Sequence, residues 1–402
     1  MIPEQWRVLF ACAISLGFTL GTVVVYSFSL FVKPLAAEFG WSRGEISIAI
    51  SILNVSVGVA SPFQGMLCDR FGSRRVLSIG QLALCAGLLA LTFLTPQLWH
   101  LYAVFLFLGL LGSGSTPLPY ARLISLWFEK QRGLGLGILM SGIGLGSLLV
   151  PFVVQHALSI GGWRQAYLML AIIAVLIPVP LNLLFIRERR TVAGSGMTAE
   201  GMSLGEALGT RVWWQMAAIF LLLAICANGV VSHLAAILTD AGMSGGDAAL
   251  ALAVFGVSSL AGRLMTGWFV DRIFAPYVAA VLFSGLFVGI ALLRIGVGAP
   301  VAACLTGVAL GAELDVMPYL VSRYFGMRAF GAIYGMCFAA FTFGMATGPL
   351  MMGYGFDQTH SYRGPLMVLL GLLAVAVIGM ATMPGYEHVR ARSVDGGVVV
   401  RA

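Results

Sequence analysis

Long apolar stretches dominate this chain of 402 residues. Hydrophobic residues make up 59% of it and charged residues 10%, against about a quarter charged in soluble domains. The stretches are roughly 20 residues or longer, enough for a helix to cross a bilayer core about 30 Å thick. We therefore predict an all-α integral membrane protein with twelve transmembrane helices, near residues 8–33, 45–68, 75–95, 101–128, 133–158, 165–186, 212–237, 247–270, 277–297, 299–324, 329–353 and 364–385.

The two halves of the chain repeat short sequence patterns. Gly65–Arg70 has the same residue spacing as Gly267–Arg272, which begins 202 residues later. An offset of 198 relates four further pairs, Gly133/Gly331, Gly137/Gly335, Gly146/Gly344 and Pro151/Pro349. Ordered matches at nearly one offset predict two copies of one membrane unit, an arrangement typical of a large class of transporters.

The repeat and the apolar stretches together predict the domain organisation. We expect two pseudo-symmetric six-helix bundles, residues 1–186 and 212–390, joined by a linker, 187–211, and followed by a tail, 391–402. Most of the 23 lysines and arginines fall in loops on one side of the predicted helices, which places both termini and the linker in the cytoplasm. This distribution explains the net charge of +7 without a nucleic-acid partner.

The sequence gives little support for enzyme chemistry. Its six cysteines are scattered one per span, so neither a disulfide framework nor a metal site is indicated. The glycine-rich stretch from Gly133 to Gly146 follows no strand and lies in an apolar helix, which favours close helix packing over nucleotide binding. We expect no enzyme activity and no cofactor.

The segment from Gly65 to Arg75, Gly-Met-Leu-Cys-Asp-Arg-Phe-Gly-Ser-Arg-Arg, resembles the cytoplasmic loop signature of the major facilitator superfamily. The resemblance implies the major facilitator fold. In such a loop the glycine lets helices approach closely, while the charged residues pair with neighbouring helix ends. We predict a cytoplasmic gate formed by Gly65, Asp69, Arg70, Gly72, Arg74, Arg75, Asp271 and Arg272.

Three further stretches narrow the resemblance: Tyr26–Arg43, Trp127–Arg164 and Gly311–Gly326. Together they are similar to bacterial members of the monocarboxylate transporter family and to their oxalate/formate-exchanging relatives. Animal members carry a lysine in the first span and an aspartate one turn before the arginine of span eight. Here these places hold Thr22–Val25 and Ser259, so the resemblance does not imply proton symport.

Arg263 is the main candidate for binding substrate. A charge at the bilayer centre costs about 2.5–3.5 kcal/mol even on a lenient scale, so an intramembrane arginine needs a reason. A guanidinium offers forked donors that match a carboxylate, and the resemblance implies this role for Arg263. The alternative is that Arg263 is structural and pairs with Asp315 or Glu313. The binding role and the structural role are compatible if substrate displaces the internal acid.

The other charges within the spans have different interpretations. Arg122 lies near the cytoplasmic end of its span, where snorkelling favours a structural role. Glu313 and Asp315 are two residues apart and point to nearly opposite helix faces. Both are candidates for a coupling proton, and we place Asp315 nearer the transport pathway because it shares a polar stripe with Tyr319 and Ser322.

Tyr120 and Tyr319 occupy equivalent places in the two repeats. Their hydroxyls are predicted to contact a substrate carboxylate or hydroxyl, while aromatic packing is the competing interpretation. Phe28, Leu145 and Phe343 are predicted to form the apolar wall of the binding site, with packing again as the alternative.

We therefore predict a secondary active transporter that moves a small monocarboxylate, such as lactate or pyruvate, by alternating access. Proton coupling is left open. One buried arginine favours a monocarboxylate over a di- or tricarboxylate. The alternatives are an exporter of drugs or other small solutes with the same fold, or a membrane sensor that transports nothing. We expect a monomer in the bacterial inner membrane whose partners are the lipid bilayer, the anion and, if coupled, protons.

Overall fold

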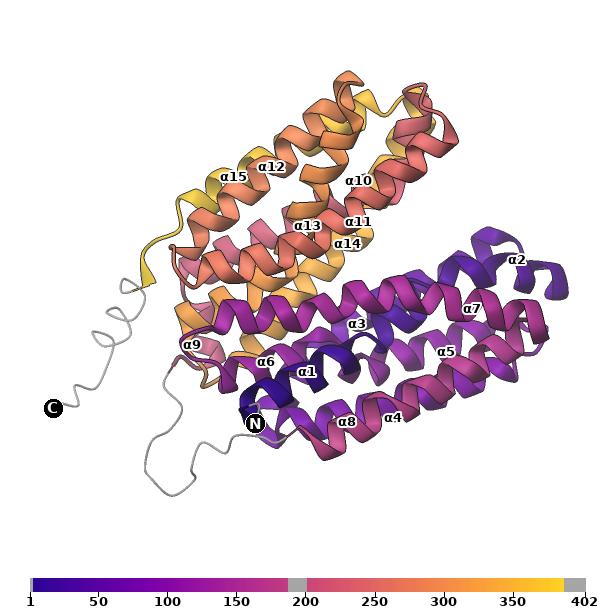
Figure 1. Cartoon of the computed structure of the whole chain (residues 1–402), viewed down its shortest axis with the longest axis horizontal. Coiled ribbons are helices and arrows are strands. Elements are labelled where there is room, and N and C mark those ends of the chain that lie inside the picture. The colour runs from indigo at the N-terminus through magenta and orange to yellow at the C-terminus, as the bar shows by residue number, and fades with distance from the viewer. Residues whose placement is uncertain (1–2, 187–200, 387–402) are drawn as a thin grey trace, which may run out of the picture. The chain divides into compact units, whose positions relative to one another are not determined.

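The computed structural model describes residues 3–186 and 201–386, which are nearly all helical (Figure 1). Residues 187–200 of the predicted linker and the predicted tail, 391–402, lie outside the described residues. The prediction of an all-α membrane fold is confirmed.

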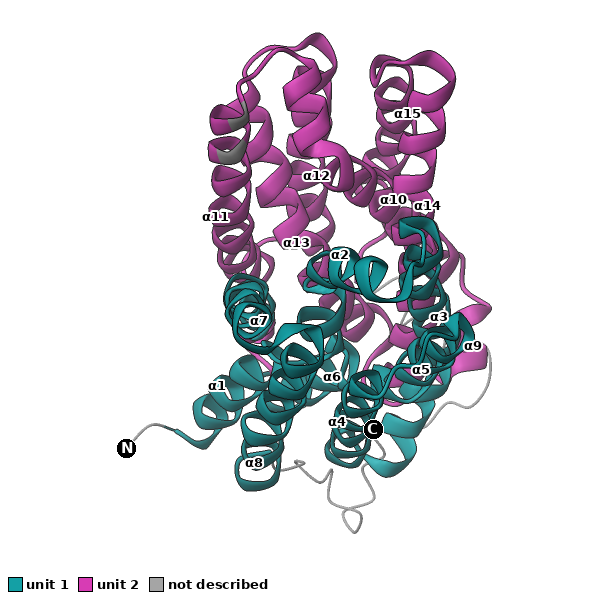
Figure 2. Cartoon of the chain, turned by 90° about the vertical axis from the view of Figure 1, so that its right-hand side faces the viewer, with its two compact units in different colours: residues 1–128, 138–190 teal, residues 129–137, 191–402 magenta. Residues whose placement is uncertain are grey.

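Two compact units make up the chain (Figure 2): unit 1, residues 1–128 and 138–190, and unit 2, residues 129–137 and 191–402. The segment 129–137 groups with unit 2 although it lies in the first half of the sequence. The first helices are α1 (Glu4–Leu16), the π-helix η1 (Gly21–Val25), α2 (Phe28–Phe39), α3 (Arg43–Phe71), α4 (Ser73–Thr92), α5 (Leu98–Leu110), the 3-10 helix η2 (Gly112–Ser115), α6 (Pro117–Trp127), α7 (Arg132–Leu176) and α8 (Pro178–Leu184). The remaining helices are α9 (Leu204–Leu208), α10 (Arg211–Asp240), α11 (Gly245–Val270), α12 (Ala275–Ile295), α13 (Ala299–Phe325), α14 (Phe330–Thr359) and α15 (Arg363–Ala381).

The helices account for the predicted membrane crossings. Within the described residues, 10 helices are long and apolar enough to span a membrane, and the pair α5 and α6, bent by 47°, makes up to 11. One of these stretches, Arg132–Leu184, has 53 residues. At 1.5 Å per residue it is about 80 Å long, more than twice the bilayer core. Its backbone leaves the helical conformation at Gly161 and Gly162, so it divides into two crossings and gives the twelve that the sequence predicts.

Unit 1 contains two helix breaks that hydrogen bonds stabilise. Between α5 and α6 the sequence Gly-Ser-Gly-Ser-Thr precedes Pro117, and both glycine and proline disfavour a continuous helix. The Leu20 N–H, just before η1, donates to Ser115 Oγ of η2 over 3.3 Å. Gln81 Nε2 donates to the carbonyls of Phe18 and Ala174. Polar groups freed from helices must find such partners within a membrane.

Glycines let α1 and α7 approach closely within unit 1. A Cβ at Gly142 would overlap the carbonyl oxygen of Ala13, and a Cβ at Gly146 would overlap that of Gly17. Such contacts between small residues replace the hydrophobic driving force that helices lack in lipid. The glycine-rich stretch therefore serves helix packing, as the sequence predicts.

In unit 2, α13 packs against α11 and α12, and α10 packs against α14 (Figure 1). The α10–α14 contact also depends on glycine, since a Cβ at Gly348 would overlap the carbonyl oxygen of Ile225. Before α9, the Met202 N–H donates to the Phe325 carbonyl over 2.8 Å, which attaches the end of the linker to unit 2.

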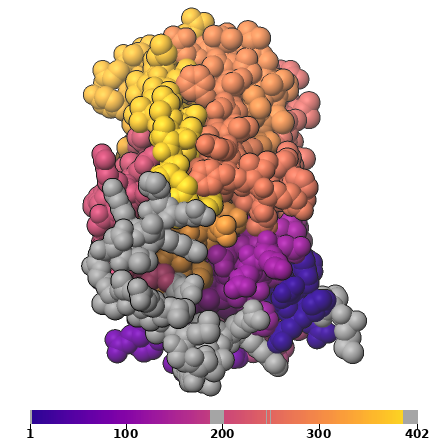
Figure 3. All heavy atoms as spheres, turned by 90° about the vertical axis from the view of Figure 1, so that its left-hand side faces the viewer, coloured from indigo at the N-terminus to yellow at the C-terminus, as the bar shows by residue number. Residues whose placement is uncertain are grey.

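The end of α15 lies along the same unit. Figure 3 shows it in yellow beside the orange helices of unit 2, and α15 contacts α12. Just after α15, the ring of Tyr386 packs against those of Phe274 and Tyr324, with centroid distances of 4.9 and 4.8 Å. The last described residue is therefore part of the folded unit.

Candidate functional site

A cluster of charged side chains lies inside unit 2, on two neighbouring transmembrane helices. Arg263 lies on α11, and Glu313 and Asp315 lie on α13. The helices cross closely because a glycine occupies the crossing: a Cβ at Gly311 would overlap the carbonyl oxygen of Ser259 and lie 3.1 Å from the Arg263 backbone nitrogen. This crossing places the arginine beside the acidic residues.

The Arg263 guanidinium pairs with Asp315. Its Nη1 donates to Oδ1 of Asp315 over 3.3 Å. Arg263 is 5% exposed, and Asp315 and Glu313 are each 3% exposed. The distance exceeds the roughly 2.7–2.9 Å of a strong charge-assisted hydrogen bond. The structure thus shows that Arg263 pairs with Asp315, one of the two interpretations that the sequence leaves open, through a long contact. A role for Arg263 in binding substrate stays a prediction.

The two acidic side chains have different neighbours. Glu313 lies close enough to Cys226 of α10 for an electrostatic interaction, and Asp315 is similarly close to Tyr334 of α14. Arg263 interacts electrostatically with both carboxyl groups. Among the described residues, Oε2 of Glu313 and Oδ2 of Asp315 have no hydrogen-bond partner. Because Glu313 and Asp315 are two residues apart, their side chains leave α13 in different directions and meet different neighbours. Both acids nevertheless lie near Arg263.

Sequence reasoning missed Tyr334 as a member of this cluster. The side chain is fully buried, and its hydroxyl lacks a hydrogen-bond partner among the residues that the structure describes. The available signal was a single phenol in an apolar, glycine-rich span, Gly331–Gly335, which does not show which helix the ring faces.

Tyr120 and Tyr319 are each held within their own unit. Tyr120 is fully buried, and Nδ2 of Asn182 donates to its hydroxyl over 3.4 Å. The Tyr319 hydroxyl donates to the carbonyl of Val270 over 2.7 Å. The two repeats therefore give their tyrosines different partners, and substrate contact by either hydroxyl stays a prediction.

The predicted wall residues are more accessible. Leu145 is 52% exposed and Phe343 is 45% exposed, while Phe28 is partly buried and packs edge-to-face on Phe105. Their role at substrate stays a prediction.

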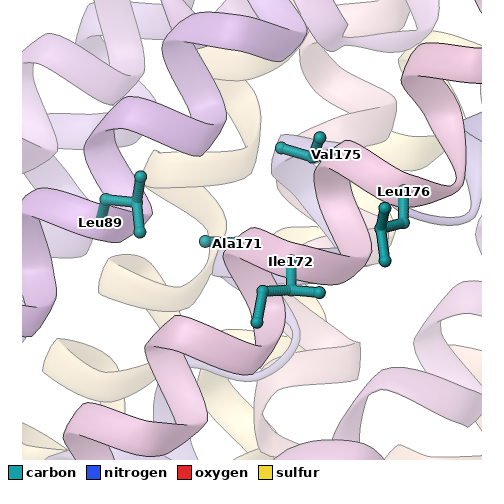
Figure 4. Close-up of a pocket in the computed structure, with 5 residues that line it drawn as sticks. All are labelled: Leu89, Ala171, Ile172, Val175 and Leu176. Carbon is teal, nitrogen blue, oxygen red and sulfur yellow. The ribbon is translucent and has the colours of Figure 1, made fainter.

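Unit 1 carries two grooves that do not contain the predicted site residues. One, of about 230 Å³, is lined only by apolar side chains, Leu89 of α4 and Ala171, Ile172, Val175 and Leu176 of α7 (Figure 4). The other, of about 320 Å³, lies between α4 and α5 and includes His100. Apolar grooves on membrane helices suit acyl chains better than a small anion.

Asp69 of the signature loop pairs with the intramembrane Arg122. Nε of Arg122 donates to Oδ1 of Asp69 over 2.9 Å, and Nη1 donates to Ser73 Oγ over 3.4 Å. Both side chains are largely buried. The contact gives Arg122 a structural role, by pairing rather than by the snorkelling that the sequence suggests.

Asp271, the repeat counterpart of Asp69, caps a helix. Its carboxylate accepts the Gly133 and Leu134 N–H groups at the start of α7, over 2.8 and 2.9 Å. An anion at a helix N-terminus is stabilised by the helix dipole. Burial raises the pKa of Asp271, while the two N–H groups act in the opposite direction. Gly133 and Gly267 allow the close approach, since a Cβ at Gly267 would overlap the Gly133 carbonyl.

The remaining gate candidates lie near the C-terminal ends of α3 and α11 and at the start of α4. Gly72 has a φ of 89°, which favours glycine in the turn between α3 and α4, and Gly65 is buried in α3. Arg74 Nη2 donates to the Leu183 carbonyl over 2.7 Å. Two guanidinium groups lie over aromatic rings, that of Arg70 over Phe71 and that of Arg272 over Trp268. Arg75 is exposed. Their action as a gate stays a prediction.

Two of the stretches that carry the family resemblance meet in unit 1. Glu38, at the end of α2, accepts Trp163 Nε1 and Arg164 Nη1, each over 2.6 Å. The Arg164 guanidinium also lies 4.1 Å from the centre of the Trp163 ring. These residues follow the α7 break at Gly162, whose φ is 73°. The contact connects α2 to the second half of α7.

The comparisons with known proteins agree with this architecture. Relatives include monocarboxylate transporter 11 of Mus musculus, 28% identical over 90% of this chain and 83% of that protein. Another is the uncharacterised MFS-type transporter YcxA of Bacillus subtilis, 25% identical over 87% of this chain and 89% of that protein.

Solved structures show the same fold. The transporter FucP in its outward conformation has a TM-score of 0.73 at 13% identity, covering 95% of this chain and 100% of that chain. The human organic anion transporter MFSD10 has a TM-score of 0.73 at 14% identity, covering 94% and 100%. The sequence model of the Major Facilitator Superfamily matches residues 9–312. The chain therefore belongs to the major facilitator superfamily and is an integral membrane transporter, not an enzyme.

Proposed function

We propose that the protein is a secondary active transporter for a small monocarboxylate, such as lactate or pyruvate. It works by alternating access of its two bundles, as a monomer in the bacterial inner membrane with both termini in the cytoplasm. The observation that carries the proposal is the buried guanidinium of Arg263 on α11. An intramembrane charge is functional by default, and a guanidinium matches the planar fork of a carboxylate. The similarity to a monocarboxylate transporter supports this substrate class.

Asp315 acts in this proposal as an internal stand-in for substrate. Its carboxyl group occupies Arg263 through one contact of 3.3 Å. A substrate carboxylate that makes two shorter hydrogen bonds replaces it at a gain, since charged hydrogen bonds contribute about 1.5–3 kcal/mol each. Asp315 thus neutralises Arg263 in the empty transporter and is displaced when the anion binds.

The charges of the same cluster support a proposal of proton coupling. It contains one guanidinium and two carboxyl groups, so it is neutral only when one carboxyl carries a proton. Substrate adds a further negative charge, and an uncompensated buried charge is costly. We therefore propose that a proton binds to Asp315 or Glu313 when the anion binds, which makes the transporter a symporter.

The test is uptake of labelled lactate and pyruvate into proteoliposomes by the parent protein and by Arg263→Gln. We expect the variant to lose about 100-fold in uptake efficiency, because it loses charged hydrogen bonds together worth about 3 kcal/mol. Arg164→Gln is the matched control, since it breaks an arginine–carboxylate pair that is exposed.

Uptake by Arg164→Gln is expected to match the parent. If Arg263→Gln transports both anions at the parental rate, the arginine is not the anchor. If the parent protein moves neither anion but exports cationic or neutral compounds, the drug-exporter alternative holds instead.

A further inference from the structure

We propose that Tyr334 is a positioning residue for transport: its hydroxyl receives the Asp315 carboxyl group when a substrate anion displaces that group from Arg263. The inference rests on the proposed function, because it concerns the exchange of Asp315 for substrate. It assigns a role to a residue that substrate need not touch.

Aromatic neighbours hold the Tyr334 ring in place. Phe330 and Phe338, one turn away in either direction on α14, lie 5.7 and 6.0 Å from it between ring centroids. Residues four apart share a helix face, so the three rings form a row along one side of α14. Packing thus fixes where the hydroxyl points, without a hydrogen bond.

Tyr334 and Asp315 each carry a buried oxygen that needs a partner. Among the described residues, neither the Tyr334 hydroxyl nor Oδ2 of Asp315 makes a hydrogen bond. The two groups are close enough to interact electrostatically across α13 and α14. Buried polar groups are nearly always hydrogen-bonded, and leaving one unsatisfied costs about 1–3 kcal/mol. A donor and an acceptor without partners on adjacent helices indicate a contact that forms in another state of the transporter.

The exchange at Arg263 needs a group that accepts the released carboxyl. A carboxyl that leaves its arginine inside the protein has a large desolvation cost unless another donor meets it. In the part of the chain that the structure describes, the charged and titratable groups near the Asp315–Tyr334 pair are Arg263 of α11, Glu313 of α13, Cys226 of α10 and Cys337 of α14. Arg263 is occupied once substrate binds, and a thiol is a weak hydrogen-bond donor. The phenol of Tyr334 is a buried neutral donor without a partner among these residues.

The test is a double-mutant cycle that measures the affinity of purified protein for lactate and pyruvate. Tyr334→Phe removes only the hydroxyl and preserves the ring packing. We expect it to weaken affinity about tenfold in the parent protein, because the displaced carboxyl loses a buried hydrogen bond. In an Asp315→Ala background no carboxyl is displaced, so the same change is expected to alter affinity less than twofold.

The matched control is Tyr324→Phe, at the C-terminal end of α13, which removes a hydroxyl that donates to the Pro384 carbonyl. It is expected to leave affinity unchanged. An equal loss from Tyr334→Phe in both backgrounds, or no loss in the parent, overturns the inference even when Arg263→Gln abolishes binding. If the parent binds neither anion, or Arg263→Gln binds as well as the parent, the proposed function itself fails, and the inference fails with it.

Discussion

Arg263 is a buried charge that needs a partner inside the membrane. A guanidinium stays charged at any physiological pH, so the empty protein must supply a negative partner inside the membrane. Asp315 supplies it from α13. In the function that we propose, the same two residues determine both the stability of the empty transporter and its affinity for an anion.

The residue-scale prediction concerns the stability of Asp315→Asn. The change removes the charge of the carboxyl group that is hydrogen-bonded to Arg263, and breaking a buried ion pair costs about 3 kcal/mol. We expect the empty variant to unfold at a lower temperature than the empty parent. We also expect lactate or pyruvate to raise the unfolding temperature of the variant by more than it raises that of the parent. Thermal unfolding with and without anion measures both effects. Asp247→Asn, at an exposed position, is the control, and equal anion effects in parent and variant would exclude the stand-in role.

The sequence identifies some of these residues more readily than others. Arg263, Glu313 and Asp315 are conspicuous because charges are rare in apolar spans. The tyrosines are not, because a phenol is common in membrane helices and its direction depends on packing that one sequence does not show. The repeat pairs Tyr120 with Tyr319, yet the tyrosine near the charges whose hydroxyl lacks a partner among the described residues is Tyr334.

At the scale of elements, small residues set the distances between helices. Spacing and hydropathy predict the helices and the role of the glycine-rich stretch in packing. They do not predict the π-helix Gly21–Val25 or the 47° bend between α5 and α6, because these depend on partners distant in sequence, such as Ser115 for Leu20. The break in α7 is signalled by Gly161 and Gly162, which separate two predicted spans.

The element-scale prediction is that Gly142→Ala destabilises unit 1. The added Cβ overlaps the Ala13 carbonyl, which belongs to the backbone of α1 and cannot turn away. Such overpacking typically costs about 1–3 kcal/mol. Gly371→Ala in α15 is the control, since no neighbouring side chain or helix lies within 4 Å of the place that its Cβ would take, and alanine favours a helix. Thermal unfolding in detergent compares the two, and equal stability of both variants would contradict close packing at Gly142.

At the scale of the whole molecule, sequence alone predicts the fold class because the bilayer limits the choices to helices or closed barrels. Composition, the repeat and the signature loop then lead to the major facilitator superfamily, which the family match confirms. The grouping of residues 129–137 with unit 2 was not predictable, because it involves contacts between residues distant in sequence, among them the cap that Asp271 forms on α7. Such a contact joins residues 138 positions apart.

The whole-molecule prediction concerns the driving force. If each monocarboxylate moves with one proton, the pair carries no net charge, so a pH gradient drives uptake and a membrane potential alone does not. We expect an inward proton gradient of one pH unit to accumulate lactate or pyruvate up to about tenfold in proteoliposomes, since one unit corresponds to about 1.4 kcal/mol. A potassium diffusion potential at equal pH is expected to give no accumulation. In a variant with Asp315→Asn and Glu313→Gln, no carboxyl in the cluster can carry the proton, so exchange of anion across the membrane is expected to continue without accumulation. Accumulation that follows the potential, or that survives in the double variant, would show that the proton is carried elsewhere or that the anion moves alone.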